Sequence, residues 1–325
     1  MQTYCVTLTP LSAFATPLKG DTLFGQLCWA VRNRFGEDRL TRYLDGYKVG
    51  QPYAVVSDAF PEGYLPLPKL PGRFYNEILG ADRKAIKKRC WLALSNVDKP
   101  LNQWLSIAKT AGEIASNVSK LSEIHPQPHN TINRQTNTTG KEGFAPYSVD
   151  QEWFVPGLRL SIYLLLDPEK ISAEECHQCL SDIGNIGYGR DASIGLGKFA
   201  IEPFTTTTTL PKQDQGNACL SLAPCAPQGL GFDSQDSFYQ LFTRFGRHGD
   251  VAVHQEGKPF KNPVLLAQTA AIFNTPPPDS GFIGQGIGGN GELSKSLPAT
   301  VHQGYAPIIG VRLGRSDASS RPESL

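Results

Sequence analysis

Alternating polar and apolar side chains predict several β-strands in the first two hundred residues. Residues 3–9 alternate with period two, which is typical of a half-buried strand. Residues 158–166 are almost continuously apolar, and residues 198–204 form a shorter segment after a glycine-rich loop. We predict a strand in each of these three segments.

Two amphipathic helices are predicted between these strands. The first is capped at Asp21 or Thr22, carries apolar residues at helical spacing, and ends at residues 35–36. The second begins at Ser172, where Ser172 and Glu175 form a capping-box pattern. Residues 83–89 predict a shorter helix with one basic face. The Pro-rich residues 51–72 predict an ordered loop packed by its aromatic side chains.

The second half repeats this pattern more weakly. Strands are predicted at residues 218–222 and 306–313, and a helix is predicted at residues 234–245. The order of elements suits an α+β fold with two ferredoxin-like (RRM-like) domains, each with an antiparallel sheet. We expect the first domain at residues 1–204, the second at 205–313, and a disordered tail at 314–325.

Composition excludes several classes of protein. Hydrophobic residues make up 40% of the 325 residues, enough for a sizeable core, and no apolar run is long enough for a membrane span. Residues 1–150 hold 18 Lys and Arg against 13 Asp and Glu, whereas the remainder holds 13 against 17. This mild asymmetry allows an RNA-binding role within an assembly, because neighbouring subunits can share phosphate neutralisation. It is equally compatible with an ordinary solvated surface.

Seven cysteines without an export signal indicate reduced thiols in the cytoplasm. Cys176 and Cys179 have the spacing of metal ligands, but no second pair lies nearby. We predict that they face the core from the helix that begins at Ser172, and we expect neither a metal ion nor a cofactor.

The glycine-rich residues 184–197 give the sharpest local pattern. Glycines allow close approach to backbone N–H groups, and Arg190, Ser193 and Lys198 supply groups for a phosphate backbone. A dinucleotide site is not indicated, because these glycines follow a helix and precede a strand. The alternative is a tight structural crossover.

Three further segments could contact RNA. A second glycine-rich loop is expected at residues 281–291. The start of the first helix, near Lys19 and Thr22, could favour an anion. Residues 125–140 predict a polar hairpin, which could clamp RNA or be an ordinary surface loop. Catalysis has little support, because only His125 or His129 could serve as a general acid or base for RNA cleavage.

Several motifs together identify a resemblance. They are residues 12–29, 57–66, 133–140, 187–199 and 302–307. The chain resembles the RAMP superfamily and, more narrowly, the subunit-four family of the Csm complex, the type III-A CRISPR effector. A related subunit of a type III-B or III-D effector remains an alternative.

The resemblance implies a non-catalytic subunit that binds the 5′ handle of the guide RNA. It would join the large polymerase-like subunit to the backbone RAMP subunit and meet target RNA only indirectly. One departure is Asn133, where superfamily members often have Asp. The resemblance implies the following RNA-contacting residues: Ser12, Lys19, Thr22, Arg134, Thr136, Thr138, Thr139, Arg190, Ser193, Lys198, Gly284, Gly286 and Gly288.

Two further expectations concern partners and activity. Partner surfaces are expected on the Pro-rich segment 51–72 and on the basic face at 83–89. The alternative function is a metal-independent endoribonuclease that processes CRISPR repeat RNA, and it would depend on His125 or His129.

Overall fold

The structure is a computed structural model, which describes residues 1–78, 80, 82–115, 118–140, 143–204, 206–249 and 260–314. The α-helices in these ranges are α1 (Gly20–Phe35), α2 (Glu37–Leu44), α3 (Arg83–Lys87), α4 (Trp104–Ile107), α5 (Ala111–Ile114) and α6 (Ala173–Ile186). Short 3-10 helices are η1 (Tyr47–Val49), η2 (Gly72–Phe74), η3 (Leu94–Asn96), η4 (Leu101–Gln103) and η5 (Ala192–Ile194). The strands are β1 (Gln2–Pro10), β2 (Ala54–Val56), β3 (Phe60–Pro61), β4 (Tyr64–Pro66), β5 (Trp91–Ala93), β6 (Ser122–His129), β7 (Tyr147–Phe154), β8 (Leu160–Leu166), β9 (Phe199–Ile201), β10 (Ala218–Ser221), β11 (Asp233–Phe238), β12 (Leu241–Arg244), β13 (Val264–Ala267), β14 (Ile272–Asn274), β15 (Phe282–Gly288) and β16 (Val301–Val311).

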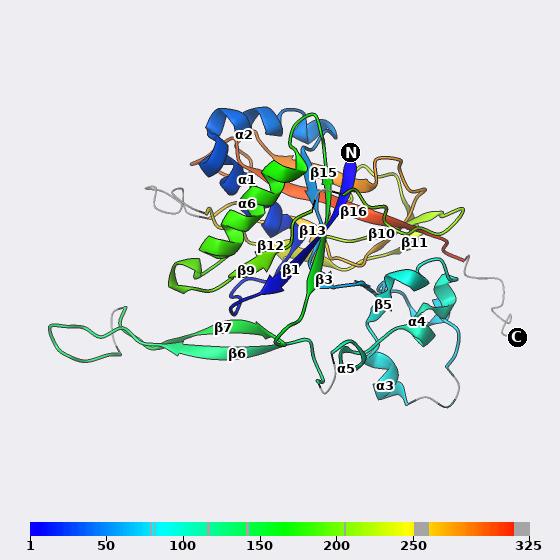
Figure 1. Ribbon diagram of the computed structural model, residues 1–325, viewed down its shortest axis with the longest axis horizontal. Helices are drawn as coiled ribbons and strands as arrows, with labels where there is room; N and C mark the ends of the chain where they lie inside the picture. Colours follow the sequence, from blue (N-terminus) through cyan, green and yellow to red (C-terminus); the bar gives the residue numbers. More distant parts are fainter. Residues whose placement is uncertain are drawn as a thin grey trace, which may run out of the picture.

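The first sheet is built from elements on both sides of a long insertion. Its strand order is β2-β8-β1-β9, with β3 also paired to β8, and all pairs are antiparallel. The helix α1 connects β1 to β2 with β8 between them, and α6 connects β8 to β9 with β1 between them. This is a βαββαβ arrangement, in which both helices can cover the sheet (Figure 1).

The second sheet has the order β11-β14-β10-β16-β15 and is formed by the last third of the chain. Between its strands, the described residues contain no helix. The predicted α+β class is therefore confirmed in its coarse form, whereas the division into two ferredoxin-like domains stays a prediction. Three smaller pairs complete the structure: β4 with β5, β6 with β7, and β12 with β13.

Helix α1 joins the two halves of the molecule. It contacts α6 and β2 of the first half and β16 of the second. Phe24 of α1 stacks on Tyr47 at 5.1 Å between ring centroids, and Tyr47 meets Tyr305 of β16 edge-on at 5.2 Å. Burial of these large rings explains why α1 is held firmly between the two sheets.

The predicted helix at residues 234–245 is wrong. The segment forms two strands, β11 and β12, which pair with β14 and β13. In β12, Leu241 and Thr243 are exposed while Phe242 and Arg244 are half-buried, so the pattern has period two. The apolar residues of segment 234–245 fit both the helical period of 3.6 residues and the strand period of two. Pairing with strands that are distant in sequence decides which element forms.

The Pro-rich segment 51–72 is ordered, as predicted, but it also contains the short strands β2, β3 and β4. Residues 52–58 are buried, including Tyr53 and Val55. Burial corrects the prediction that this part of the segment is a partner surface. The predicted basic helix is α3, and its surface is exposed. Of the expected disordered tail, residues 315–325 lie outside the described residues.

Candidate nucleic-acid interface

Two loops that are distant in sequence, one after β1 and one between α6 and β9, meet beside the first sheet. Ser12 Oγ accepts a hydrogen bond from the backbone N–H of Lys198 at 2.9 Å, and Thr16 Oγ1 accepts one from the N–H of Arg190 at 2.9 Å. The backbone N–H of Gly197 donates to the carbonyl of Ala13 at 2.7 Å. The structure therefore brings the predicted residues Ser12, Arg190 and Lys198 together.

The glycine-rich loop is shaped by close backbone packing. A Cβ atom on Gly197 would lie 2.1 Å from the carbonyl oxygen of Tyr188, at a φ of +72°. Only glycine fits this position, so part of the glycine pattern serves the crossover between α6 and β9. A tight structural crossover accounts for these glycines, but it does not account for the charged side chains between them.

Those charged side chains face solvent. Arg190 is 54% exposed, and its Nε lies 3.2 Å from Asp191 Oδ2. Ser193 and Lys198 are also exposed, and Lys198 has no ion pair with any residue that the structure describes. An ion pair between exposed neighbours is weak. Arg190 and Lys198 therefore remain available to an anionic ligand.

The two-stranded ribbon β6–β7 is anchored on the same loops. Phe14 and Glu152 exchange both backbone hydrogen bonds, at 2.9 and 2.8 Å. The Phe14 ring meets Phe154 edge-on at 5.5 Å and lies 6.3 Å from Tyr188 of the glycine-rich loop. From this base the ribbon extends away from the body of the molecule (Figure 1).

The ribbon tip holds four of the predicted residues. Arg134, Thr136, Thr138 and Thr139 are all exposed. The hydroxyls of Thr136 and Thr138 lie 2.8 Å apart, and the backbones of Asn133 and Thr138 form a bridge. The tip lies at the far end of the ribbon from the glycine-rich loop, so the predicted site divides into two separate groups (Figure 1).

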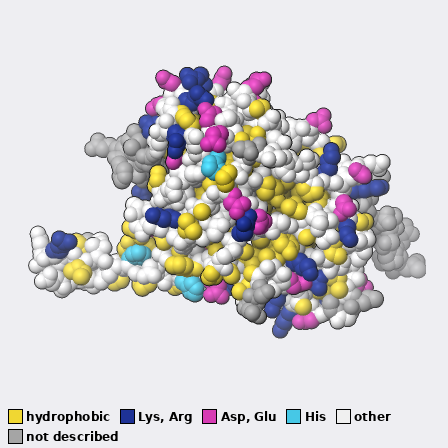
Figure 2. Space-filling model, in the orientation of Figure 1, with side chains coloured by type: hydrophobic (Ala, Val, Ile, Leu, Met, Phe, Trp, Pro, Cys, Tyr) yellow, Lys and Arg dark blue, Asp and Glu magenta, His cyan; other side chains and the backbone are white. Residues whose placement is uncertain are grey.

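One face of the ribbon was missed by the sequence reasoning. Strand pairing places His125 and His129 of β6 on the same face as Tyr147 and Trp153 of β7. His129 stacks on Tyr147 at 5.2 Å, and Tyr147 and Trp153 are 55% and 50% exposed. Hydrophobic and histidine side chains follow the ribbon stem in Figure 2. Such a face can stack on unpaired bases. The alternation His-Pro-Gln-Pro-His was the signal for it.

At the start of α1, where an anionic ligand was expected, a carboxylate of the protein itself is bound. Asp58 is buried, and its carboxylate accepts hydrogen bonds from Lys19 Nζ at 2.7 Å, from the N–H of Gly20 at 2.8 Å and from Thr269 Oγ1 at 2.5 Å. The neighbouring Asp58 raises the pKa of Lys19. The expected anion position is therefore filled by Asp58, and Thr22 is half-buried one turn further on.

The predicted cap at Asp21 or Thr22 is wrong. The N-cap is Lys19, which makes no side-chain capping bond. Asp21 is buried instead and forms a two-pronged ion pair with Arg244, with Nε and Nη2 at 2.7 and 3.0 Å. His302 Nε2 lies 3.3 Å away. Burial favours the neutral acid, but His302 and Arg244 together hold the pKa of Asp21 below its usual value.

The second predicted glycine-rich loop is also wrong. Gly284, Gly286 and Gly288 lie in strand β15, which pairs with β16 over its whole length. A Cβ on Gly286 would lie 2.6 Å from the ring of Tyr47. These glycines allow close packing within the protein, and the expected loop of free amides does not form.

The two cysteines with metal-ligand spacing face the core, as predicted. Cys176 and Cys179 are fully buried on α6, and burial raises the pKa of Cys179 to about 12. Across the described ranges, no three His, Cys, Asp or Glu side chains gather in a way that could hold a metal ion. The helices of the same ranges are too short or too polar to cross a membrane.

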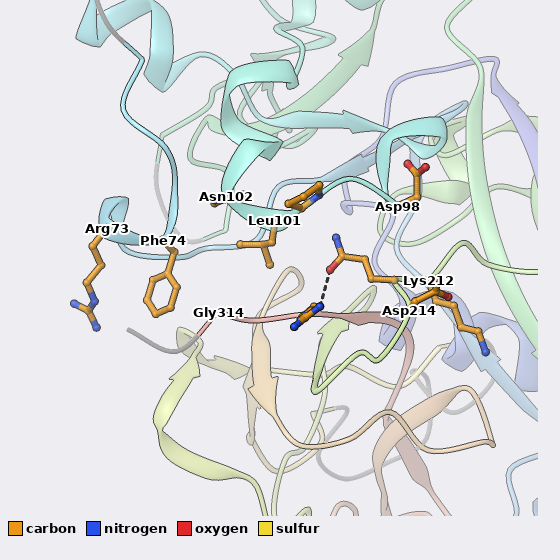
Figure 3. Close-up of a pocket in the computed structure, with 11 residues that line it drawn as sticks. Arg73, Phe74, Asp98, Leu101, Asn102, Lys212, Asp214 and Gly314 are labelled. Carbon is orange, nitrogen blue, oxygen red and sulfur yellow. Dashed lines mark hydrogen bonds between the residues drawn. The ribbon is translucent and has the colours of Figure 1, made fainter. Parts of the chain in front are cut away.

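A cleft of about 890 Å³ lies away from the ribbon, between η2, η4 and the end of β16. Figure 3 shows Arg73 and Phe74 at one end and Asp98, Lys212 and Asp214 at the other. Within the part of the chain described, none of these charged groups has an ion pair. The cleft is thus a second polar surface, separate from the ribbon.

Comparison with known proteins shows which fold this is. No protein-family model and no curated protein matches the sequence. Solved structures do match: chains of the Csm1-Csm4 cassette in complex with cA4 and with pppApA superpose with TM-scores of 0.60 and 0.59. Each is 16% identical, and each match covers 97% of this chain and 100% of the other. A chain of the Csm3-Csm4 subcomplex in the type III-A CRISPR-Cas interference complex matches with a TM-score of 0.58 and 15% identity, covering 95% and 99%.

The chain therefore has the same fold as these matched chains, and the fold agrees with the resemblance carried by the sequence motifs. Csm4 is the component that the matching complexes share, and the chain has a Csm4-like fold along nearly its entire length.

Proposed function

We propose that the chain is a non-catalytic RNA-binding scaffold subunit of a type III CRISPR effector complex. It binds the 5′ handle of the guide RNA and links the large polymerase-like subunit to the backbone RAMP subunit. The observation that carries this proposal is the junction of the loop containing Arg190 and Lys198 with the base of the protruding ribbon. The Csm4-like fold supports a role within such a complex.

Three kinds of contact would hold the RNA. Arg190 and Lys198 would neutralise phosphates near the base of the ribbon. Tyr147 and Trp153 would stack on splayed bases along its face, and the Thr136–Thr139 tip would donate hydroxyls to sugar or phosphate. Because stacking on Tyr147 and Trp153 requires unpaired bases, this surface suits a single-stranded end better than a duplex.

Partner subunits would use other surfaces. The exposed helix α3 lies towards the other end of the molecule from the ribbon tip (Figure 1). We assign protein contacts to this region and to the cleft lined by Arg73 and Lys212. We further interpret residues 1–204 as a ferredoxin-like domain, because the first sheet has the required βαββαβ order, and residues 205–313 as a second domain built on its own antiparallel sheet.

The endoribonuclease alternative has weaker support. His125 and His129 share one strand face, but four residues of strand separate them by about 13 Å, at roughly 3.3 Å per residue. A general acid and a general base must both come within hydrogen-bond reach of one phosphodiester, about 2.6–3.2 Å. A backbone separation of this size is unfavourable for a general acid and a general base that act on the same phosphodiester.

Incubation with labelled repeat RNA, with and without EDTA, tests the proposal. We expect the intact chain to bind RNA that carries the repeat-derived 5′ end without cutting it, and to co-purify with the large and backbone subunits. Specific cleavage that is lost in the His125→Ala, His129→Ala variant would overturn the scaffold function. Tight binding without co-purification would leave the RNA site intact and refute the linking role.

A further inference from the structure

A small cavity lies between α1, α2 and segments of the second half of the chain. Its volume is about 150 Å³. Trp29 forms part of the α1 wall. The remaining apolar lining comes from α2, from the segment before β16 and from the first residue of β16, and consists of Leu40, Leu44, Leu297, Ala299 and Val301.

One cation lines this cavity without a partner. Lys261 is half-buried, and its backbone N–H donates to the carbonyl of Gly246 at 2.8 Å. Its stem packs over Gly246, where an added Cβ would lie 3.2 Å from Lys261 Cδ. Within the described residues, its ammonium group has neither an ion pair nor a hydrogen bond. A desolvated charge without a partner is costly, and burial accordingly lowers the pKa of Lys261.

The other charged groups of the cavity cancel or are neutral. Arg32 Nη2 lies 3.3 Å from Glu37 Oε2, and its guanidinium lies 5.3 Å from the Trp29 ring centre. His248 Nε2 shares a 2.8 Å hydrogen bond with Ser294 Oγ, and burial followed by the nearby Lys261 lowers the pKa of His248. Burial raises the pKa of the Cys28 thiol to about 11. Among the described residues that line the cavity, Lys261 is therefore the one cation without an ion-pair partner.

Size and charge together define a ligand. A cavity of this volume with one apolar wall has room for a group of about the size of benzene. We propose that it binds a small organic monoanion with one aromatic or branched apolar body, whose carboxylate pairs with the ammonium group of Lys261. The apolar body lies against Trp29 and the leucines of α2. This site is independent of the proposed RNA function.

Fluorine NMR on the intact chain tests the proposal with two probes, para-fluorobenzoate and its neutral analogue para-fluorotoluene. We expect both to bind, and fluorobenzoate to be displaced by unlabelled benzoate. Lys261→Met keeps the stem and removes the charge, so it should weaken fluorobenzoate binding by about ten- to a hundredfold, as expected for a charge-assisted hydrogen bond. Fluorotoluene binding should change little, and Lys261→Arg should retain most fluorobenzoate affinity.

A cavity-filling variant, Ala299→Phe, should abolish binding of both probes. If that variant fails to fold, Leu297→Trp fills the same space, and a melting curve checks each variant. Equal fluorobenzoate affinity of the intact chain and Lys261→Met would overturn the proposal. So would fluorotoluene binding without fluorobenzoate binding, or an intact chain that binds neither probe.

Discussion

Two glycine-rich segments of this chain look alike in sequence and differ in structure. Residues 187–197 form a loop whose ends are buried and whose middle carries exposed residues such as Arg190. Residues 282–288 form strand β15, whose Gly284 and Gly286 pack against β16 and Tyr47. In both segments glycine is required because other atoms approach the backbone closely. In the first, the loop backbone packs against itself; in the second, a strand packs against a neighbouring strand and an aromatic ring.

This difference shows that glycine content marks tight packing and does not by itself mark a ligand site. The useful signal is the kind of residue between the glycines. Arg190, Ser193 and Lys198 cannot be buried without partners, so they predict an exposed loop. Ile283 and Ile287 alternate with glycines, which fits the two-residue period of a strand, and β15 has buried positions on both of its faces.

The largest effect that would sharpen this comparison comes from a matched pair of substitutions, Gly284→Ala and Gly195→Ala. The two glycines have nearly the same φ, +94° and +96°. A Cβ on Gly284 would lie 2.0 Å from the carbonyl oxygen of Gly304, whereas Gly195 has no neighbour within 4 Å. We expect Gly284→Ala to lower the free energy of unfolding by about 3 kcal/mol or more, and Gly195→Ala by about 1–2 kcal/mol.

Urea denaturation of both variants measures the difference. Equal losses would mean that backbone conformation alone governs both positions. The contrast between the open loop and the packed strand would then be refuted.

The second effect concerns the junction of α1 with strands β12 and β16. Asp21→Asn removes the buried carboxylate that pairs with Arg244, and we expect a loss of about 2 kcal/mol near neutral pH. Because the folded pKa of Asp21 is below its usual value, its contribution is fully present above about pH 4. That contribution is lost as the pH falls through the folded pKa.

The stability difference between the intact chain and Asp21→Asn should therefore shrink on acidification. Chemical denaturation at several pH values tests this, with the exposed Asp82→Asn as a control that should show a much smaller difference. A difference that stays constant down to low pH would contradict the assigned ion pair.

The first half of the fold could be predicted well because its signals are local. The capping box at Ser172 and Glu175 forms as expected, and the apolar stripe of α1 is buried. In the second half, residues 234–245 carry apolar positions that fit a helix or a strand equally well. The outcome depends on pairing with β13 and β14, which are distant in sequence, and no local pattern contains that information.

The RNA-contacting residues named from the sequence stay a prediction, and the layout of these residues could not be predicted at all. The sequence does not reveal that Asp58 occupies the start of α1, because that contact joins residues 38 positions apart. It also does not reveal that the ribbon places Thr136 and Lys198 in separate groups. The aromatic face with Tyr147 and Trp153 requires the register of β6 against β7, which follows from folding alone.

The third effect concerns the exposed tip of the β6–β7 ribbon. Deleting residues 136–139 removes three threonine hydroxyls and one amide from the ribbon tip, all of them exposed. We expect the melting temperature to change little and RNA affinity to fall about tenfold to a hundredfold, at about 0.5–1.5 kcal/mol per hydrogen bond lost. The triple variant Thr136→Ala, Thr138→Ala, Thr139→Ala keeps the loop length and separates hydroxyl contacts from loop shape. A collapse in stability would make the tip structural.

The smallest effect concerns the cations of the open loop. The double substitution Arg190→Ala, Lys198→Ala should weaken RNA binding by about three- to tenfold at physiological salt. The log–log salt slope should flatten by about 1.4, at about 0.7 per phosphate contact for single strands. Lys295→Ala, beside the second glycine-rich segment, is the matched control and should change neither quantity. Folding should be unaffected, because Arg190 is 54% exposed and its ion pair with Asp191 is a surface pair. If the salt slope and affinity of the double variant equal those of the intact chain, then the two glycine-rich segments have the same purely structural role. The RNA would then have to lie along the ribbon alone.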